Sequence, residues 1–177
     1  MAILPIRTFG DPVLRQKARP VERVTELHRG LVRNMLATMR EAPGVGLAGP
    51  QVGVLERIFV WEVDERWGAV IDPEIESRSD ETVVDEEGCL SLPGLLAPVE
   101  RSAAVRVTGL DENGSPVTLE AEGLLARVCQ HEIDHLDGVL FIDRLPDDLR
   151  ADALRTLRGQ MLGWEDAPPA APRREAL

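Results

Sequence analysis

The segment His131-Glu132-Ile133-Asp134-His135 constrains this chain more than any other. In a helix, at about 100° per residue, its two histidines lie roughly 40° apart on one face, one turn above the other. Both imidazoles can then reach a single cation at about 2.0–2.1 Å. The alternative is a pair of histidines packed on a helix face, but the H-E-x-x-H string is rare by chance in a chain with 3 histidines. The pattern therefore predicts a metal site on a helix.

A catalytic metal needs a third protein ligand and a position left for water. Two common sources of this third ligand are absent. A histidine six residues after His135 is missing, because Phe141 stands there, and residues 146–164 contain no glutamate. Cys129 lies about 200° around the helix from His131, so we expect it in the core. Cys89 lies in a segment rich in Gly and Pro, which favours close approach of the backbone to a site. We expect Cys89 to be the third ligand, and the alternative role for it is a nucleophile activated by a histidine.

Helical geometry leaves the general base open between Glu132 and Asp134, which fall about 80° to either side of the line between the histidines. Glu132 is longer and leans toward the helix N-terminus, where it can reach water at a metal. The H-E-x-x-H motif of metalloproteases assigns this role to Glu. Asp134 and Asp137 are expected to face solvent or to hydrogen-bond a metal ligand from behind.

The rest of the chain predicts an α+β fold of antiparallel sheets around the H-E-x-x-H helix, with a further helix at the C-terminus. Helices are expected over about 21–40 and 124–137, and from Pro146 onward. Short strands are expected at 58–61, 69–71, 105–107 and 117–119, with a turn at 111–114 between the last two. The apolar stripes of the first and third helices are assigned to Val24, Leu27, Leu31 and Met35, and to Leu149, Leu154, Leu157 and Met161. Strands grouped between helices argue against a doubly wound parallel sheet.

Length and charge bound the class of protein. The 177 residues predict a single catalytic domain over 1–164 and a disordered tail over 165–177, where Ala and Pro dominate. The net charge of −11 argues against non-specific binding to DNA or to an anionic membrane. No apolar run is long enough to span a bilayer, and the N-terminus lacks the pattern of a secretory signal. With two cysteines, the chain is expected to be a reduced, cytoplasmic protein.

One further segment, over 43–53, is too rich in Gly and Pro for a regular element and yet apolar apart from Gln51. Loops normally face water, so an apolar loop indicates either a buried turn or the wall of a cleft. In a cleft, its bare backbone would face a ligand and Gln51 would polarise a carbonyl group.

Three segments together resemble the signature motifs of the peptide deformylases. They are Gly44-Val45-Gly46-Leu47-Ala48-Gly49-Pro50-Gln51, Glu87-Gly88-Cys89-Leu90-Ser91 and Gln130-His131-Glu132-Ile133-Asp134-His135. They stand in the family's order and at similar spacing, and the resemblance covers about residues 1–146. One motif alone would be weakly specific, whereas three in order are highly specific. The family's fold is also α+β, with antiparallel sheets around the helix that carries H-E-x-x-H.

The resemblance implies that Cys89, His131 and His135 bind one divalent metal ion, Fe²⁺ in the cell, which Ni²⁺, Co²⁺ or Zn²⁺ can replace. It implies that Glu132 is the general acid and base. The substrate it implies is the N-terminal formyl-methionine of nascent bacterial polypeptides, from which formate is released.

The same resemblance implies how the substrate is held. Gln51 and the backbone N–H of Leu90 would bind the carbonyl oxygen, and the backbone of Gly46 would dock the peptide. An apolar pocket for the methionine side chain is expected from positions around the motifs. Its candidate residues are Val45, Leu92 and Val128. Arg127 is expected to point outward or to line the rim of this pocket.

Two positions depart from the family pattern. Gly49 stands where many members have Ala, which is expected to loosen the loop, and Leu96 stands where some have a basic residue. A weaker hypothesis concerns the C-terminal helix, whose basic residues stand out in an acidic chain and would contact the ribosome. They are Arg150, Arg155 and Arg158, and the alternative is a solvated helix face.

Three other classes of protein compete with this interpretation. A peptidase with the same motif would cleave ordinary peptide bonds rather than formyl groups. A binding module with a structural metal would have a closed coordination sphere and no turnover. A cysteine hydrolase would be sensitive to thiol alkylation but not to chelators.

Overall fold

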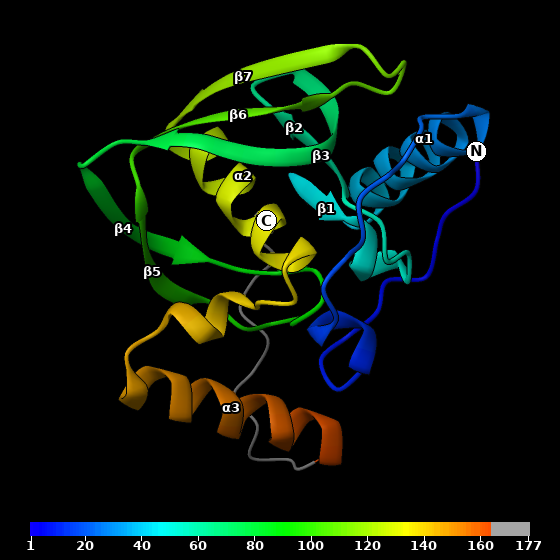
Figure 1. The fold of residues 1–177 in the computed structure, drawn as a ribbon. Coiled ribbons are helices and arrows are strands. Elements are labelled where there is room, and N and C mark those ends of the chain that lie inside the picture. Colours follow the sequence, from blue (N-terminus) through cyan, green and yellow to red (C-terminus); the bar gives the residue numbers. More distant parts are fainter. Residues whose placement is uncertain (164–177) are drawn as a thin grey trace.

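Two antiparallel sheets flank helix α2 (Gly123–Leu136) in the computed structural model, which describes residues 1–163 (Figure 1). The larger sheet has the order β1-β2-β3-β6-β7, and the smaller sheet pairs β4 with β5. The strands are β1 (Gly46–Ala48), β2 (Ile58–Val63), β3 (Arg66–Arg78), β4 (Thr82–Glu87), β5 (Ala97–Ser102), β6 (Ala104–Leu110) and β7 (Pro116–Glu122). The remaining helices are η1 (Pro12–Arg15), α1 (Glu26–Glu41), η2 (Gly49–Val52), η3 (Phe141–Arg144) and α3 (Asp147–Leu162). The α+β prediction is confirmed, and the tail expected over 165–177 lies outside the described residues.

Strand β2 is buried on both faces because α1 and α2 cover opposite sides of the larger sheet. Successive side chains of a strand point to opposite faces. Ile58 and Val60 accordingly pack in the cluster with α1, and Phe59 and Trp61 pack in the cluster with α2. The continuous apolar run of β2 follows from this double burial.

Helix α2 follows β7 without a connecting loop. Its first residue, Gly123, has φ +54°, a left-handed conformation that glycine adopts without steric cost and that turns the chain from strand into helix. Its end agrees with the expected stop, since Gly138 has φ +75° and packs against the backbone of Arg15, with no space for a Cβ. The expected bounds of this helix are correct to one residue at each end.

The first helix begins later than the sequence predicts, at Glu26 rather than near residue 21. The N–H of Val21 donates instead to the carboxylate of Asp72, at 2.9 Å, so the chain before α1 is tied to β3. Thr25 is the N-cap residue, and its N–H donates to Nδ1 of His28 at 2.9 Å. A tertiary hydrogen bond and a cap therefore decide this boundary.

The expected apolar stripes are partly wrong. Leu27 is 84% exposed, because it lies in the first turn of α1 and the buried part of that helix starts at Val32. In α3, Leu149 and Met161 are also exposed. The residues that α3 buries are Ala153, Leu157 and Gly159.

Two strands and one segment were not expected as regular structure. In β5, buried and exposed residues alternate, but the charge of Arg101 at a buried position hides this pattern, whereas β4 is exposed apart from Glu87 and has no alternation to detect. The segment over 43–53 contains β1 and η2, contrary to the expectation that its Gly and Pro content precludes a regular element. The Oε1 atom of Gln51 accepts from the N–H of Ala48 at 2.7 Å, which stabilises the turn between them.

Within residues 1–163, none of the helices combines the length and the hydropathy needed to cross a bilayer.

Candidate metal centre

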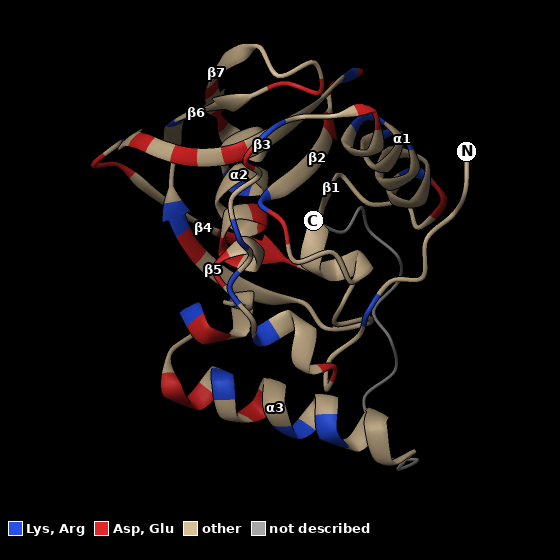
Figure 2. Cartoon of the chain, turned by 45° about the vertical axis from the view of Figure 1, so that its right-hand side comes forward, with Lys and Arg blue, Asp and Glu red and all other residues tan. Residues whose placement is uncertain are grey.

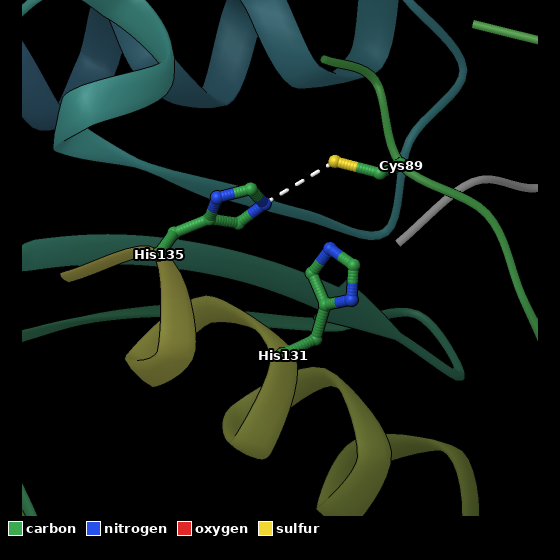
Figure 3. A group of neighbouring side chains, drawn as sticks. All are labelled: Cys89, His131 and His135. Carbon is green, nitrogen blue, oxygen red and sulfur yellow. Dashed lines mark hydrogen bonds between the residues drawn. The ribbon is translucent and has the colours of Figure 1, made fainter. Parts of the chain in front are cut away.

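The three predicted metal ligands lie together in the interior. Cys89 comes from the loop after β4, and His131 and His135 come from one face of α2, with their rings directed toward the sulfur (Figure 3). One ligand atom from each lies within 4.8 Å of the others, and all three side chains are buried. The Sγ of Cys89 is 3.2 Å from Nε2 of His135. The loop and the helix thus place a thiol and two imidazoles around one point.

Glu87 sets the orientation of His131. Nδ1 of His131 lies 2.9 Å from Oε2 of Glu87. Because a carboxylate accepts hydrogen bonds, Nδ1 carries the proton and is the donor of this hydrogen bond. The lone pair then resides on Nε2, which is buried and has no hydrogen-bond partner among the described residues. A carboxylate behind a histidine is the arrangement that orients metal-ligating imidazoles in proteins.

Glu132 follows His131 on α2, and both of its carboxylate oxygens are buried and without hydrogen-bond partners among the described residues. Burial raises the pKa of Glu132 well above its usual value, and the negative charge of Glu87 raises it further. Gly46 makes room for this carboxyl group, since a Cβ built there would lie 2.9 Å from Cδ of Glu132. Any other residue at position 46 would displace the carboxyl group.

The site fits a divalent transition metal. Buried polar atoms without partners are costly, and among the described residues Nε2 of His131 and both oxygens of Glu132 are buried and unpartnered, so a cation and its water would satisfy them. One thiolate with two imidazoles is a donor set for Zn, Fe, Co or Ni. Burial raises the pKa of the Cys89 thiol to about 12, and a bound cation reverses this because it binds the thiolate.

Gln51 lies beside this cluster and is fully buried. Its amide nitrogen is 3.6 Å from Sγ of Cys89 and 3.3 Å from Oγ of Ser91, while its Oε1 accepts from the backbone of η2's N-cap, Ala48. The N–H groups of Gln51 therefore point toward the loop that carries Cys89 and Leu90.

The residues expected to form a methionine pocket do not all lie together. Val45 and Val128 belong to one core cluster, and a Cβ on Gly46 would lie 3.0 Å from Cγ1 of Val128. Leu92 is fully buried in a different cluster, which also contains Cys89. The structure thus places Gly46 against Glu132 and Val128, puts Val45 in the core cluster of Val128, and puts Leu92 in the cluster that contains Cys89.

Two charged residues differ from expectation. Arg127 neither points outward nor lies at a rim: it is buried and donates to Oε1 of Glu87 at 2.8 Å and to the carbonyl of Val99 at 2.9 Å. Asp134 is buried too and accepts from Arg101 at 2.7 Å, so of the two expected environments the solvent-facing one is wrong.

Asp137, which follows α2, and Cys129 within it are as expected. Asp137 is half exposed and pairs with Arg57 at 2.8 Å. Cys129 is fully buried in the core cluster of α2.

Sequence reasoning missed Glu87. Burial raises the pKa of this carboxyl group, but hydrogen bonds from His131 and Arg101 outweigh that effect, and its pKa lies below the usual range. Two arginines, Arg101 and Arg127, share one carboxylate that is 0% exposed. The available signal was the position of Glu87 two residues before Cys89, together with arginines inside otherwise apolar segments.

Comparison with known proteins identifies the family. A family model described as polypeptide deformylase matches residues 3–151 of the chain. The chain belongs to this family. A peptide deformylase of Acidothermus cellulolyticus is 51% identical over 158 residues, which cover 89% of this chain and 87% of the relative. The chain is therefore an enzyme, and its role is peptide deformylation.

Solved structures agree with this assignment. The peptide deformylase of Thermus thermophilus is 50% identical and matches with a TM-score of 0.85. The match covers 91% of the present chain and 96% of the Thermus chain. A structure from Synechococcus elongatus in complex with actinonin is 44% identical, with a TM-score of 0.82 and 86% of each chain covered. Peptide deformylases are metalloenzymes, and the group of Cys89, His131 and His135 is suited to hold a metal.

Proposed function

We propose that this deformylase removes the formyl group from the N-terminal formyl-methionine of nascent bacterial polypeptides, with release of formate. One divalent metal ion is held by Cys89, His131 and His135; it is Fe²⁺ in the cell, and Ni²⁺, Co²⁺ or Zn²⁺ can replace it. The observation that carries this proposal is the buried thiol and two imidazoles within 4.8 Å of one another, beside a carboxyl group without a partner among the described residues.

The protein's own groups divide the remaining work. When bound, a divalent cation supplies Lewis acidity that makes water a nucleophile near neutral pH. The negative thiolate of Cys89 partly neutralises that charge, so Glu132 must contribute more to the activation of water. Glu132 accepts a proton from the attacking water and returns it to the departing amine of methionine. Its position against Gly46, with both oxygens free of other partners within residues 1–163, supports this role.

Gln51 and the backbone N–H of Leu90 stabilise the negative oxygen that develops on the formyl carbon. The support is the direction of the Gln51 amide, 3.6 Å from Sγ of Cys89, and the place of Leu90 next to Cys89 in the chain. Loss of one such donor typically costs about 2.7–4 kcal/mol of transition-state stabilisation.

The substrate is held by backbone and by apolar side chains. The backbone of Gly46 docks the peptide, and Val45, Leu92 and Val128 contact the methionine side chain. An apolar pocket discriminates by only about 1–3 kcal/mol per methylene, so unbranched analogues of methionine should be accepted with lower efficiency. The place of Val128 against Gly46, and of Val45 in the same core cluster, supports two of these three assignments.

Such a substrate places the enzyme in the cytoplasm, where it acts at the ribosome. It does not bind DNA directly. For the ribosome, the candidate contact is α3, which carries Arg150, Arg155 and Arg158, whereas its acidic residues lie in its first half (Figure 2). Arg155 is exposed and pairs only with Asp152 of the same helix among the described residues. Deletion of residues 147–177 should reduce co-sedimentation with ribosomes, and unaltered co-sedimentation would exclude this contact.

The decisive assay is formate release from formyl-Met-Ala-Ser. Anaerobic Fe²⁺-loaded protein should release formate, whereas chelated protein should not. Glu132→Gln should keep its metal and lose deformylation, because an amide cannot accept the proton of water. Near-normal turnover by this variant would refute the role of Glu132, and activity that survives complete metal removal would refute the metal mechanism.

A further inference from the structure

The short helix η3 (Phe141–Arg144) contacts the surroundings of His131 at both of its ends. The ring of Phe141 is stacked against that of His131, with ring centroids 6.1 Å apart and planes inclined by 27°. At the other end, Arg144 donates to both oxygens of Asp134, from Nε at 3.2 Å and from an Nη atom at 2.7 Å. The helix therefore contacts the proposed ligand His131 directly through Phe141. Through Arg144 it is also hydrogen-bonded to Asp134, the first of the charged side chains that lead to His131.

Asp134 passes this contact inward. The oxygen that accepts from Nε of Arg144 also accepts from Arg101 at 2.7 Å. Arg101 is 6% exposed, and its two other donors hold both oxygens of Glu87, at 2.8 and 3.0 Å. Glu87 in turn accepts from Nδ1 of His131. An unbroken sequence of charged hydrogen bonds thus leads from a half-exposed arginine to a metal ligand.

We propose that Arg144 is a positioning residue for the metal site, acting through Asp134, Arg101 and Glu87 on the orientation of the His131 ring. The proposal rests on the metal site of the proposed function. It concerns affinity for the metal rather than contact with substrate, since Arg144 reaches neither the ligand atoms nor Glu132.

The physical argument concerns what each group can do once Arg144 is removed. Asp134 is 11% exposed, so without the two-pronged grip of Arg144 its carboxylate can turn toward water. The donor of Arg101 that binds Asp134 would then lose its fixed partner. Because the other two donors of Arg101 hold Glu87, the position of Glu87 would become less fixed as well. A buried guanidinium keeps one geometry only while all its partners are fixed. The His131 ring therefore gains freedom although no contact to it has been deleted.

Two variants and a matched control test this idea. Arg144→Met keeps the aliphatic stem and removes the charge, and Arg144→Lys restores the charge without the two-pronged geometry. Arg150→Met is the control, because Arg150 is 45% exposed, similar to 49% for Arg144, and binds Asp143 rather than Asp134. The measured quantity is the affinity for Co²⁺, from competition with a chelator under reducing, anaerobic conditions.

Arg144→Met should weaken Co²⁺ binding by roughly three- to ten-fold, less than the 10–100-fold typical of groups bonded directly to a ligand. Arg144→Lys should recover part of the loss, and Arg150→Met should bind as the unmodified protein does. Equal affinities for Arg144→Met and Arg150→Met would overturn the proposal. Failure of the unmodified protein itself to bind Co²⁺ would instead overturn the proposed metal site.

A double-mutant cycle distinguishes positioning from a merely structural effect. If Arg144 acts through Glu87, then Arg144→Met should add no more than about a twofold loss in a Glu87→Gln background, because the route is already broken. Asp134→Asn serves as the background if Glu87→Gln does not fold. A full, additive loss in either background would show that Arg144 acts by another route and would contradict the proposal.

Discussion

At the scale of single residues, the site depends on a missing side chain as much as on those present. Gly46 leaves the space in which the carboxyl group of Glu132 lies, and Val128 closes the same space from α2. A general base must be within hydrogen-bond reach of the proton that it takes. The position of Glu132 is therefore set by the strand opposite to its own helix.

Gly46→Ala tests this dependence. The added methyl group forces Glu132 to move, and a misplacement of about 1 Å can cost on the order of 100-fold in rate. We expect kcat/KM for formyl-Met-Ala-Ser to fall by about that factor, with metal content unchanged. Gly30→Ala is the control, because its Cβ would meet only an Nη atom of Arg33, at 4.0 Å, in α1, where Ala is the better helix former. Equal activity in both variants would show that Glu132 does not need this position.

The two buried cysteines offer a second comparison at this scale. Cys89→Ala should abolish or severely weaken metal binding, because it removes the only thiolate among the proposed ligands. Cys129→Ala removes a sulfur of equal size from the core of α2 and should retain the metal, with at most a modest loss of stability. Metal analysis after dialysis checks both variants, and an unchanged content in Cys89→Ala would eliminate this residue as a ligand.

At the scale of elements, β1 and η2 form a tight turn that brings Gln51 to the site. Gly49 begins η2, and a Cβ there would lie 2.8 Å from the carbonyl oxygens of Val54 and Glu56. The sequence predicted that glycine at this position loosens the loop, and the structure gives a steric reason for glycine there. Glycine allows the chain after η2 to fold back against the turn.

Gly49→Ala should consequently destabilise the protein. The methyl group would meet the backbone carbonyl oxygens of residues 54–56, and such overpacking typically costs about 1–3 kcal/mol. Urea unfolding should show a lower midpoint with an unchanged slope, since the effect is on the native state. An equal or higher midpoint would mean that the backbone of residues 54–56 yields easily.

At the scale of the whole molecule, the proposed metal would join parts of the chain that are far apart in sequence. Cys89 belongs to the connection between β4 and β5, and the two histidines belong to α2. A ligand that binds only the folded state stabilises it by mass action, by about 4 kcal/mol at a thousand times its Kd.

Removal of the metal should therefore lower the Tm, by roughly 8–16 °C from that saturation in a chain of this size. The Tm of metal-loaded protein should also rise with free metal concentration. Calorimetry with and without chelator measures the effect, and Cys89→Ala should show no difference between the two conditions. A Tm independent of the chelator would argue against a tightly bound ion.

The sequence by itself determined the local parts of this protein. Helical periodicity places His131, Glu132 and His135 on neighbouring faces of α2 wherever that helix lies, and the end of the helix follows from Gly138. Tertiary structure alone decided what stands behind these residues. The contacts of Glu87 with Arg101 and Arg127 join separate strands and a helix, and no periodicity encodes them. The physical reason is that buried charges are tolerated only beside partners, and partners distant in sequence become neighbours only when the chain has folded.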